Sequence, residues 1–236
     1  DRVLALPFTL ELAAYSPHRF AREILAGALA ARRVIVGNNF RFGRRQAGDV
    51  ATLEEVGREF GFAVDALPAV EWGGSAVSSS RVRAAVAAGR MGEARRLLGA
   101  PFPLRGPVVS GRGIGSRRTV PTLNLAPESE LLPADGVYVS ETADLVTGQV
   151  WPSVTNVGLR PTFGPGGRVV ETHLLGDFGG AAPERIEVRF FRRLRDERSF
   201  ASPEELKARI VADIGQAERF HRLRAAAGRA CAALAV

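Results

Sequence analysis

Apolar and polar positions divide the chain into two parts with different periodicities. In residues 1–99, short apolar runs such as "DRVLALPF" (1–8) and "RVIVG" (33–37) alternate with segments of helical period. One such segment, 16–31, opens with a serine N-cap and a proline at the first helical position. Strands that alternate with helices are typical of a parallel sheet covered by helices, with the apolar runs as buried strands, so we expect an α/β domain here.

After residue 99 the pattern changes to short β-like runs. The stretch "APFPLRGPV" (100–108) carries three prolines and is interpreted as a linker. Six runs of strand type follow, separated by Gly, Pro and Asp turns: 107–111, 122–127, 136–145, 150–158, 169–178 and 185–195. A capping box formed by Ser202 and Glu205, with Pro203 at the first helical position, then predicts a C-terminal helix. Residues 100–236 are therefore expected to form an antiparallel barrel or sandwich followed by a helix.

The composition argues against a membrane-spanning, a disulfide-rich or a zinc-binding protein. The 236 residues suit one large or two modest domains, and 46% apolar residues are ample for a core. No apolar run approaches ~18 residues and no signal-peptide pattern is visible, so we expect no membrane partner and a cytoplasmic location. The single Cys231 excludes an internal disulfide framework, and one cysteine with three histidines argues against zinc. Because Asp1 opens directly on an apolar run, we also expect that an N-terminal portion is missing.

The net charge of +7 comes almost wholly from arginine, with Lys207 as the only lysine. The basic residues are scattered, apart from small clusters at 117–118 and 192–195. Nucleic-acid binding usually requires a basic stripe, whereas scattered arginines favour small phosphorylated ligands. We therefore expect no nucleic-acid partner.

A glycine-rich stretch, "SGRGIGSRR" (110–118), is the first candidate for phosphate chemistry. It contains the following small residues at close spacing: Gly111, Gly113, Gly115 and Ser116. Glycines allow positive φ and close backbone approach, so successive N–H groups can face an anion. A flexible hairpin loop explains the same spacing, and no glycine-lysine-serine follows as in a Walker motif. Both interpretations stay open.

Thr122 and Asn124 lie two residues apart and therefore share one face of a strand. Their hydroxyl and amide oxygens are ligands that Mg²⁺ accepts together with phosphate oxygens. Pro121 removes a backbone donor, so the strand must begin or bulge there. A cross-strand hydrogen bond at the surface is an equally valid role for the two side chains.

Glu171 lies in the apolar stretch "VVETHLL" (169–175). Alternation places it on one strand face with Val169 and His173. A carboxylate near the apolar end of a barrel is a candidate general base for a hydroxyl group. His173 is the alternative base, and a solvated surface position is the alternative role for Glu171. Arg160 could pair with Glu171 or contact phosphate.

Six blocks occur in a fixed order: the glycine-rich loop, "PTLN" (121–124), "GVY" (136–138), "NVGLRPTF" (156–163), "VVETHLLGDF" (169–178) and the segment 185–214. In this order they resemble the riboflavin kinase domain, over roughly residues 100–220. The resemblance implies a six-stranded Greek-key barrel with a C-terminal helix. It also implies that the domain phosphorylates riboflavin to FMN, with ATP as donor and Mg²⁺ as cofactor.

The resemblance further assigns roles to individual residues. Thr122 and Asn124 match the family's Pro-Thr-x-Asn motif, whose side chains hold Mg²⁺ and ATP phosphates. Glu171 matches the carboxylate that accepts the proton of the ribityl 5′-hydroxyl. The glycine-rich loop matches the flap over the nucleotide. The segment from Arg195 to Phe200 and the start of the final helix are similar to the part that lines the flavin. The sequence departs from many relatives at 119–120, where Thr-Val stands in place of Gly-Phe.

Two blocks of the first half carry a second resemblance. "VGNNFRFGRRQAGD" (36–49) follows a predicted strand, and "VSSSRVRAAV" (77–86) places serines at a helix N-terminus, where phosphate can bind. Singly, a turn and a serine cap explain them. Together they resemble the FMN adenylyltransferase module, a Rossmann-like nucleotidyltransferase domain that precedes riboflavin kinase in bacterial bifunctional FAD synthetases. The resemblance implies nucleotide or flavin contacts from Asn39, Phe40, Phe42, Ser79, Ser80 and Arg83.

The His-x-Gly-His motif of that module, which handles the triphosphate, does not occur in the sequence. Residues 1–99 are therefore interpreted as a partial adenylyltransferase domain and 100–236 as the kinase domain. We expect this chain not to adenylylate FMN, although a longer parent would. Two other functions stay open: a non-catalytic barrel that binds flavin or RNA, and a kinase of another small alcohol.

Overall fold

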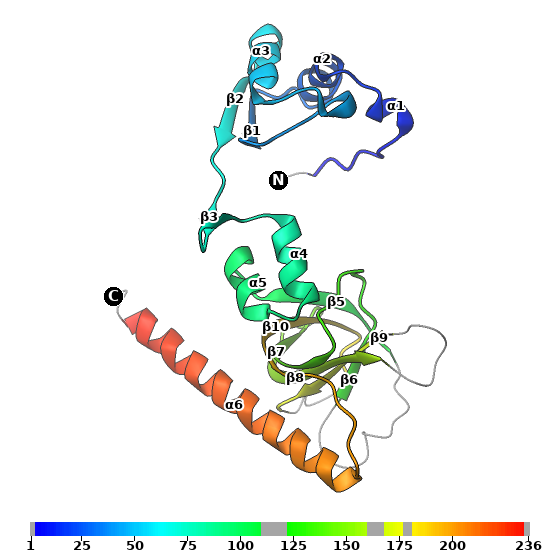
Figure 1. Ribbon diagram of the computed structural model, residues 1–236, viewed down its shortest axis with the longest axis vertical. Coiled ribbons are helices and arrows are strands. Elements are labelled where there is room, and N and C mark those ends of the chain that lie inside the picture. The colour runs from blue at the N-terminus through cyan, green and yellow to red at the C-terminus, as the bar shows by residue number, and fades with distance from the viewer. Residues whose placement is uncertain (1–2, 110–121, 160–167, 177–180, 234–236) are drawn as a thin grey trace. The chain divides into compact units, whose positions relative to one another are not determined.

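The computed structural model describes residues 3–109, 122–159, 168–176 and 181–233 (Figure 1). The chain forms two compact units, Asp1–Ala76 and Val77–Val236. Helices α4 (Ser79–Ala87) and α5 (Met91–Leu98) pack against each other, and α5 also packs on two barrel strands. The units thus divide before these helices, whereas the sequence pattern changes after them at residue 99. Helical periodicity shows that a helix has an apolar face, but not which half of the chain covers it.

The first unit combines short helices with a two-stranded parallel sheet, as expected for an α/β domain. Its elements are α1 (Leu10–Ala13), α2 (Pro17–Phe20), η1 (Ala21–Ala28), β1 (Arg33–Gly37), η2 (Arg44–Gln46), α3 (Val50–Phe60), β2 (Ala63–Leu67), β3 (Glu71–Trp72) and β4 (Ser75–Ala76). Strands β1 and β2 pair in parallel, and β3 and β4 form a small hairpin. The core of the unit consists of Ala21, Phe42, Leu53, Val56 and Phe62.

The apolar run at the start does not form the buried strand that its composition predicts. Residues 3–8 belong to no strand, and the side chains of Val3 and Phe8 are 96% and 84% exposed. A strand gains stability only beside a partner that satisfies its backbone groups. Apolar composition alone does not show whether such a partner exists.

The second unit is a closed six-stranded barrel followed by a long helix (Figure 1). Its remaining elements are β5 (Phe102–Val109), β6 (Thr122–Leu125), β7 (Gly136–Asp144), β8 (Val150–Leu159), β9 (Arg168–Leu174), β10 (Arg185–Arg195) and α6 (Pro203–Ala233). Around the barrel the strand order is β10-β5-β6-β9-β8-β7, with every pair antiparallel. The barrel and the C-terminal helix agree with the expected fold.

The proline-rich stretch 100–108 is a barrel strand, so its interpretation as a linker is wrong. Strand β5 pairs with β10 from Phe102 to Pro107. On its other side it pairs with β6 at Val108 and Val109, and the carbonyl oxygens of Arg105 and Pro107 accept hydrogen bonds from the backbone of Glu128 and Ala126. A proline has no N–H to donate to a sheet ladder, but its carbonyl oxygen can still accept, as that of Pro107 does here.

A ring of five hydroxyl groups lies inside the barrel among the apolar side chains. Its members come from β7, β8 and β9 and are fully buried: Ser140, Thr142, Ser153, Thr155 and Thr172. Each oxygen lies 2.7–2.9 Å from its two neighbours in the ring. Because a hydroxyl both donates and accepts, the ring can satisfy every member and remove the cost of burying it.

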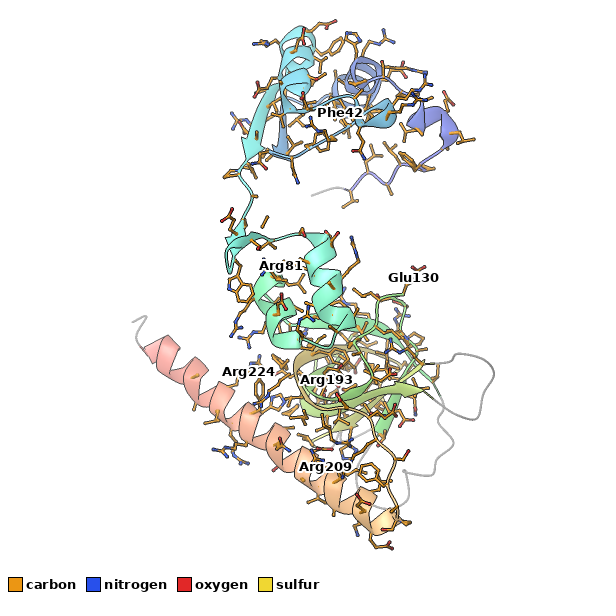
Figure 2. All side chains as sticks on the ribbon, in the orientation of Figure 1. Phe42, Arg81, Glu130, Arg193, Arg209 and Arg224 are labelled. Carbon is orange, nitrogen blue, oxygen red and sulfur yellow. The ribbon has the colours of Figure 1, made fainter. Side chains whose placement is uncertain are left out.

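Helix α6 is fixed to the barrel near an irregularity in β10. The pairing of β10 with β7 shifts register beside Phe191, whose ring lies against that of His221 on α6. The Nε2 atom of His221 lies 3.0 Å from the carbonyl oxygen of Ser140 on β7. Arg224 of α6, labelled in Figure 2, lies over the Phe191 ring and forms an ion pair with Glu141. Aromatic, hydrogen-bonded and charged contacts thus hold the middle of the helix on the barrel.

Candidate active site

The β6–β9 pair brings together the polar residues that the sequence singles out. In this pair Thr122 lies opposite His173, and Asn124 lies opposite Glu171. The residues between them, Leu123 and Thr172, are buried inside the barrel, so the four polar side chains lie on its outer face. The alternation expected for "VVETHLL" is therefore confirmed.

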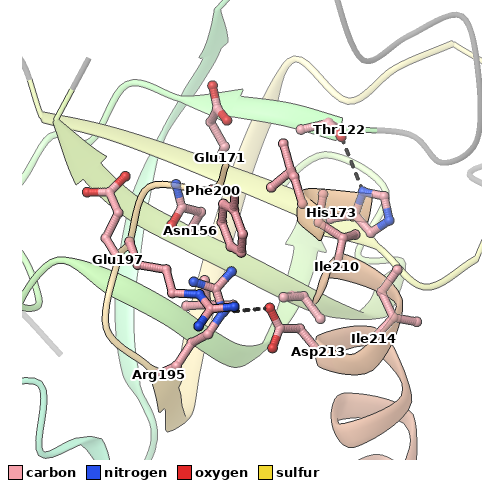
Figure 3. A pocket seen from close by; sticks show the side chains of 14 residues that line it. Thr122, Asn156, Glu171, His173, Arg195, Glu197, Phe200, Ile210, Asp213 and Ile214 are labelled. Carbon is pink, nitrogen blue, oxygen red and sulfur yellow. Dashed lines mark hydrogen bonds and ion pairs between the residues drawn. The ribbon is translucent and has the colours of Figure 1, made fainter. Parts of the chain in front are cut away.

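A cavity of about 370 Å³ opens on this outer face, between the barrel and the start of α6 (Figure 3). Its barrel wall consists of Thr122, Val137, Val154, Asn156, Glu171 and His173. The segment after β10 contributes Arg195, Glu197, Arg198 and Phe200, and the helix contributes Leu206, Ile210, Asp213 and Ile214. Glu171 and Thr122 thus share one cavity, which is the relationship that a general base and a phosphate site require.

A cluster of charged side chains joins the end of β10 to α6 at the far wall of the cavity. Arg195 donates a hydrogen bond from Nε to Oδ2 of Asp213, with 2.8 Å between the two atoms. Arg209 lies 3.2 Å from the other oxygen of the same carboxylate. Asp213 is only 2% exposed, so its charge depends on these two guanidinium groups.

Phe200 projects among these side chains as the aromatic part of the wall (Figure 3). The guanidinium carbons of Arg195 and Arg198 lie 5.5 and 4.8 Å from the centre of its ring. Arg198 also forms an ion pair with Glu205 at the start of α6. The segment 195–200 is thus tied to the helix by two acidic residues, which keeps Phe200 at the cavity.

Two further polar residues line the cavity beside β8. Asn156 of β8 lies opposite Glu171 in the β8–β9 pair. Glu197 reaches the backbone of β8 at Gly158, where any side chain would overlap its carboxylate. Gly158 therefore permits this close approach. The cavity contains three carboxylates, those of Glu171, Glu197 and Asp213, and Glu171 is the one beside Thr122 and Asn124.

His173 has only one of its two ring nitrogens paired. Its Nδ1 atom lies 3.2 Å from the hydroxyl oxygen of Thr122 (Figure 3). Its Nε2 atom is buried and has no hydrogen-bond partner among the described residues. Burial lowers the pKa of His173, which favours the neutral imidazole.

Asn124 lines a second, smaller cavity of about 270 Å³ on the same side of the barrel. The other lining residues come from β5, from β9 and from the turn after β6: Val109, Leu125, Ala126, Pro127, Arg168, Val169 and Val170. Asn124 and Glu171 are cross-strand partners but face different cavities.

Comparison with known proteins assigns the barrel to a protein family. A family model described as riboflavin kinase matches residues 98–221, and one described as FAD synthetase matches residues 1–81. The chain belongs to the riboflavin kinase family. The bifunctional riboflavin kinase/FMN adenylyltransferase of Pseudomonas fluorescens is 39% identical over 218 residues, which cover 92% of this chain and 70% of the relative. The protein of that name from Escherichia coli strain K12 is 34% identical over 223 residues, which cover 94% and 71%.

A solved structure extends the similarity to the fold. A protein from Streptococcus pneumoniae, named a macrolide-efflux protein, superposes with a TM-score of 0.78 and 29% identity. The match covers 87% of this chain and 66% of that one. Among the helices described for this chain, none has the length and apolar character to cross a membrane.

The outer face of the β6–β9 pair carries oxygen donors of the kinds that Mg²⁺ accepts. Within the described residues, no three His, Cys, Asp or Glu side chains form a metal-binding group. The neighbouring donors are instead the hydroxyl of Thr122, the amide of Asn124 and the carboxylate of Glu171. Mg²⁺ takes oxygen ligands, usually few from the protein, and completes its shell with water and substrate phosphates.

Several predicted residues of the kinase half lie outside the described part of the chain. These are Gly111, Gly113, Gly115, Ser116 and Arg160. Of the predicted flavin-lining residues, both Arg195 and Phe200 line the cavity. Sequence reasoning did not single out Asp213, and it included Glu197 only as part of the segment from Arg195 to Phe200. Asp213 had a signal, because it interrupts the apolar stripe of Leu206, Ile210 and Ile214 with a carboxylate.

Three residues predicted for the adenylyltransferase half lie in the first unit. Phe40 and Phe42 stack with their ring centres 5.5 Å apart, and Phe42 is buried in the core of that unit (Figure 2). Asn39 follows the end of β1. The buried position of Phe42 gives it a packing role in addition to any contact with a ligand.

The other three, Ser79, Ser80 and Arg83, lie on α4 in the second unit. The N-cap of this helix is Ser78, whose hydroxyl accepts a hydrogen bond from the backbone N–H of Arg81. Arg83 lies within hydrogen-bond distance of the Ser80 hydroxyl, at 3.4 Å. Since Ser78 caps the helix, Ser79 and Ser80 are not needed for capping.

Proposed function

We propose that the barrel and α6 transfer the γ-phosphoryl group of ATP to the 5′-hydroxyl of riboflavin, giving FMN and ADP. The observation that carries this proposal is the placement of Glu171 in the same cavity as Thr122, with Asn124 directly across the strand pair. Phosphoryl transfer depends mainly on positioning and charge neutralisation, which this arrangement can supply.

Glu171 acts in this proposal as the general base. The 5′-oxygen forms a bond to the γ-phosphorus while the bond from that phosphorus to the bridging oxygen of ADP breaks, and the hydroxyl proton passes to the Glu171 carboxylate. Glu171 is partly exposed to the cavity and so can reach a hydroxyl that enters it. Asn156, opposite it on β8, can hold the same part of the substrate by a hydrogen bond.

Thr122 and Asn124 are proposed to bind Mg²⁺ and the phosphates of ATP. When bound, the ion neutralises charge on the transferring phosphoryl group. Thr122 presents its hydroxyl to the large cavity and Asn124 its amide to the small one, so the two residues can bridge nucleotide and flavin. The glycine-rich loop at 111–116 is proposed to cover the nucleotide.

The wall opposite Glu171 is proposed to hold the flavin ring. Phe200 offers an aromatic face, and Leu206, Ile210 and Ile214 offer an apolar surface. Arg195, fixed by Asp213, can donate hydrogen bonds to the carbonyl oxygens of the ring. The aromatic and apolar surfaces match the planar face of the flavin ring, and the Arg195 donors match its polar edge.

The first unit is proposed to be part of an FMN adenylyltransferase, as the match to FAD synthetase over residues 1–81 supports. The proposed partners are small molecules only, namely riboflavin, FMN and ATP. A reaction that consumes ATP suits a cytoplasmic location, as does the single cysteine of the sequence.

The direct test is to incubate the protein with riboflavin, ATP and Mg²⁺ and to measure FMN by chromatography. We expect Glu171→Gln to lower kcat by about 10²- to 10⁴-fold, because the amide cannot accept the proton. Glu184→Gln, which alters an exposed carboxylate before β10, is the matched control and should leave kcat unchanged. FMN formation at the wild-type rate by Glu171→Gln would remove Glu171 from the mechanism, and no FMN from the wild type would overturn the proposed function.

A further inference from the structure

His173 follows Glu171 by two residues on β9 and lies on the same outer face, directly across from Thr122. It lines the large cavity together with both of them. Its imidazole is therefore placed to act on the group proposed to bind metal and on the substrate at once. Neither role depends on His173 being the general base.

The contact with Thr122 selects one arrangement of hydrogen atoms. A neutral imidazole has one N–H and one bare nitrogen, and the hydroxyl of Thr122 can donate or accept. If Nδ1 is bare, the hydroxyl hydrogen points to it across the 3.2 Å contact, and the oxygen lone pairs of Thr122 are left for a cation. If Nδ1 carries the hydrogen, Nδ1 donates it to the hydroxyl oxygen of Thr122, and one lone pair of that oxygen is used. The first arrangement leaves both lone pairs of the oxygen for a cation and other ligands, whereas the second leaves only one, so the first suits a metal-binding threonine better.

The bare Nδ1 atom fixes the remaining hydrogen on Nε2. This atom is buried and has no partner among the described residues. A buried N–H without an acceptor is unfavourable, and native structures seldom keep one without a reason. His173 lines the large cavity, so an oxygen of a ligand bound there is one source of the missing acceptor.

We propose that His173 is a positioning residue that accepts the Thr122 hydroxyl hydrogen at Nδ1 and donates from Nε2 to a hydroxyl oxygen of the ribityl chain. This inference rests on the proposed riboflavin kinase function. It gives His173 two separate tasks. Through Thr122 it orients the metal ligand, and through its own N–H it holds the substrate tail beside Glu171.

Two substitutions separate the tasks. In His173→Asn the side-chain amide lies near the former Nδ1 position and can still accept from Thr122, but it does not reach the Nε2 position. In His173→Gln the longer side chain places a donor near the former Nε2 position and leaves Thr122 without its acceptor. His173→Leu removes both contacts, and thermal unfolding of all three variants shows whether they are folded.

Two binding measurements report on the contact with Thr122 and on the contact with the substrate, without measuring catalysis. Mn²⁺ affinity in the presence of ADP, followed by electron paramagnetic resonance, reports the metal site. Quenching of riboflavin fluorescence, in the absence of metal and nucleotide, reports the flavin site. We expect His173→Asn to weaken riboflavin about tenfold and leave Mn²⁺ within about twofold, and His173→Gln to show the reverse. His173→Leu should weaken both.

The tautomer provides an independent readout. The chain has three histidines, so the ¹⁵N signals of His173 in histidine-labelled protein can be assigned by comparison with His173→Asn. We expect a bare Nδ1 and a protonated Nε2. An Nδ1–H tautomer would overturn the inference, and so would Mn²⁺ and riboflavin affinities that are the same in the wild type and all variants.

The role of His173 and the proposed function can fail separately. If the wild type makes FMN and the variants bind both ligands normally, only the role of His173 is refuted. If the wild type neither binds riboflavin nor makes FMN, the proposed function is refuted.

Discussion

Arg195 at the end of β10 and Asp213 on α6 form a buried hydrogen-bonded ion pair, with 2.8 Å between Nε and Oδ2. The pair joins the barrel to the helix at the wall of the cavity. Because Arg209 also contacts the Asp213 carboxylate, one acidic group balances two guanidinium groups. Replacing that group should therefore affect both stability and flavin binding.

We expect Asp213→Ala to lower the free energy of unfolding by about 3 kcal/mol, since it leaves Arg195 without its buried partner. Riboflavin affinity should fall as well, because Arg195 is then free to leave the cavity wall. Urea unfolding and fluorescence quenching measure the two effects. Glu218→Gln, which removes an exposed ion pair with Arg222 on the same helix, is the control and should cost less than about 0.5 kcal/mol. Equal effects of the two substitutions would contradict the role of Asp213.

The hydroxyl ring makes a prediction about the barrel interior. Thr172→Val keeps the shape of the side chain but deprives Thr142 and Thr155 of a partner. We expect a loss of about 1–3 kcal/mol in the free energy of unfolding, measured in urea. Thr172→Ser keeps the hydroxyl and removes one methyl group, so it should cost only about 1 kcal/mol. A valine variant as stable as the wild type would show that the ring contributes little.

The contact between His221 and Ser140 predicts a pH dependence of stability. Burial is the main cause that lowers the pKa of His221, the nearby positive charge of Arg224 acts in the same direction, and Glu141 and the hydrogen bond to Ser140 oppose it. Since the native pKa is lower than the unfolded value of about 6.5, the unfolded state binds more protons below that pH. Stability is therefore full above about pH 6.5 and falls as the pH decreases.

The variant that isolates this effect is His221→Gln, whose amide can still donate to the Ser140 carbonyl but does not titrate in this range. We expect its free energy of unfolding to change less than that of the wild type between pH 7.5 and pH 5. Urea titrations at a series of pH values provide the comparison. An identical pH dependence in the two proteins would assign the loss to other groups.

A chain of these 236 residues is expected to form no FAD from FMN and ATP, because no His-x-Gly-His motif occurs in it. Radiolabelled ATP with FMN as acceptor measures this directly. Labelled FAD above background would show that residues 1–99 suffice for adenylylation. FMN formation from riboflavin in the same preparation serves as the positive control.

Residues whose positions follow from strand periodicity were predicted well from the sequence. Thr122, Asn124, Glu171 and His173 share an outer face because alternate residues of a strand point the same way. That the two strands are neighbours does not follow from periodicity. It was not predicted, because pairing between β6 and β9 joins segments that are distant in the sequence. The resemblance to a family implied only that Thr122, Asn124 and Glu171 serve one site.

The predictions that failed concern which segments lie beside each other. The run at 1–8 looks like a strand, but its described residues, 3–8, belong to none, and the stretch 100–108 looks like a linker but is paired with β10. Asp213 was missed for the same reason, since a carboxylate on a helix gains its role only from Arg195, which belongs to another element. The local sequence pattern indicates the secondary structure that a segment favours, whereas its tertiary neighbours determine which structure it forms.

Helix α6 borders the cavity with residues of its first three turns and is fastened to the barrel farther along, at His221. With a rise of about 1.5 Å per residue, roughly 16 Å of helix separate Ile210 from that point. Deleting the sequence after residue 216 would keep every helical residue that borders the cavity and the pair of Asp213 with Arg195, but would remove the contacts of His221 and Arg224 with the barrel. Such a shortened protein would retain the groups for chemistry, and its apolar cavity wall would rest on that one buried ion pair.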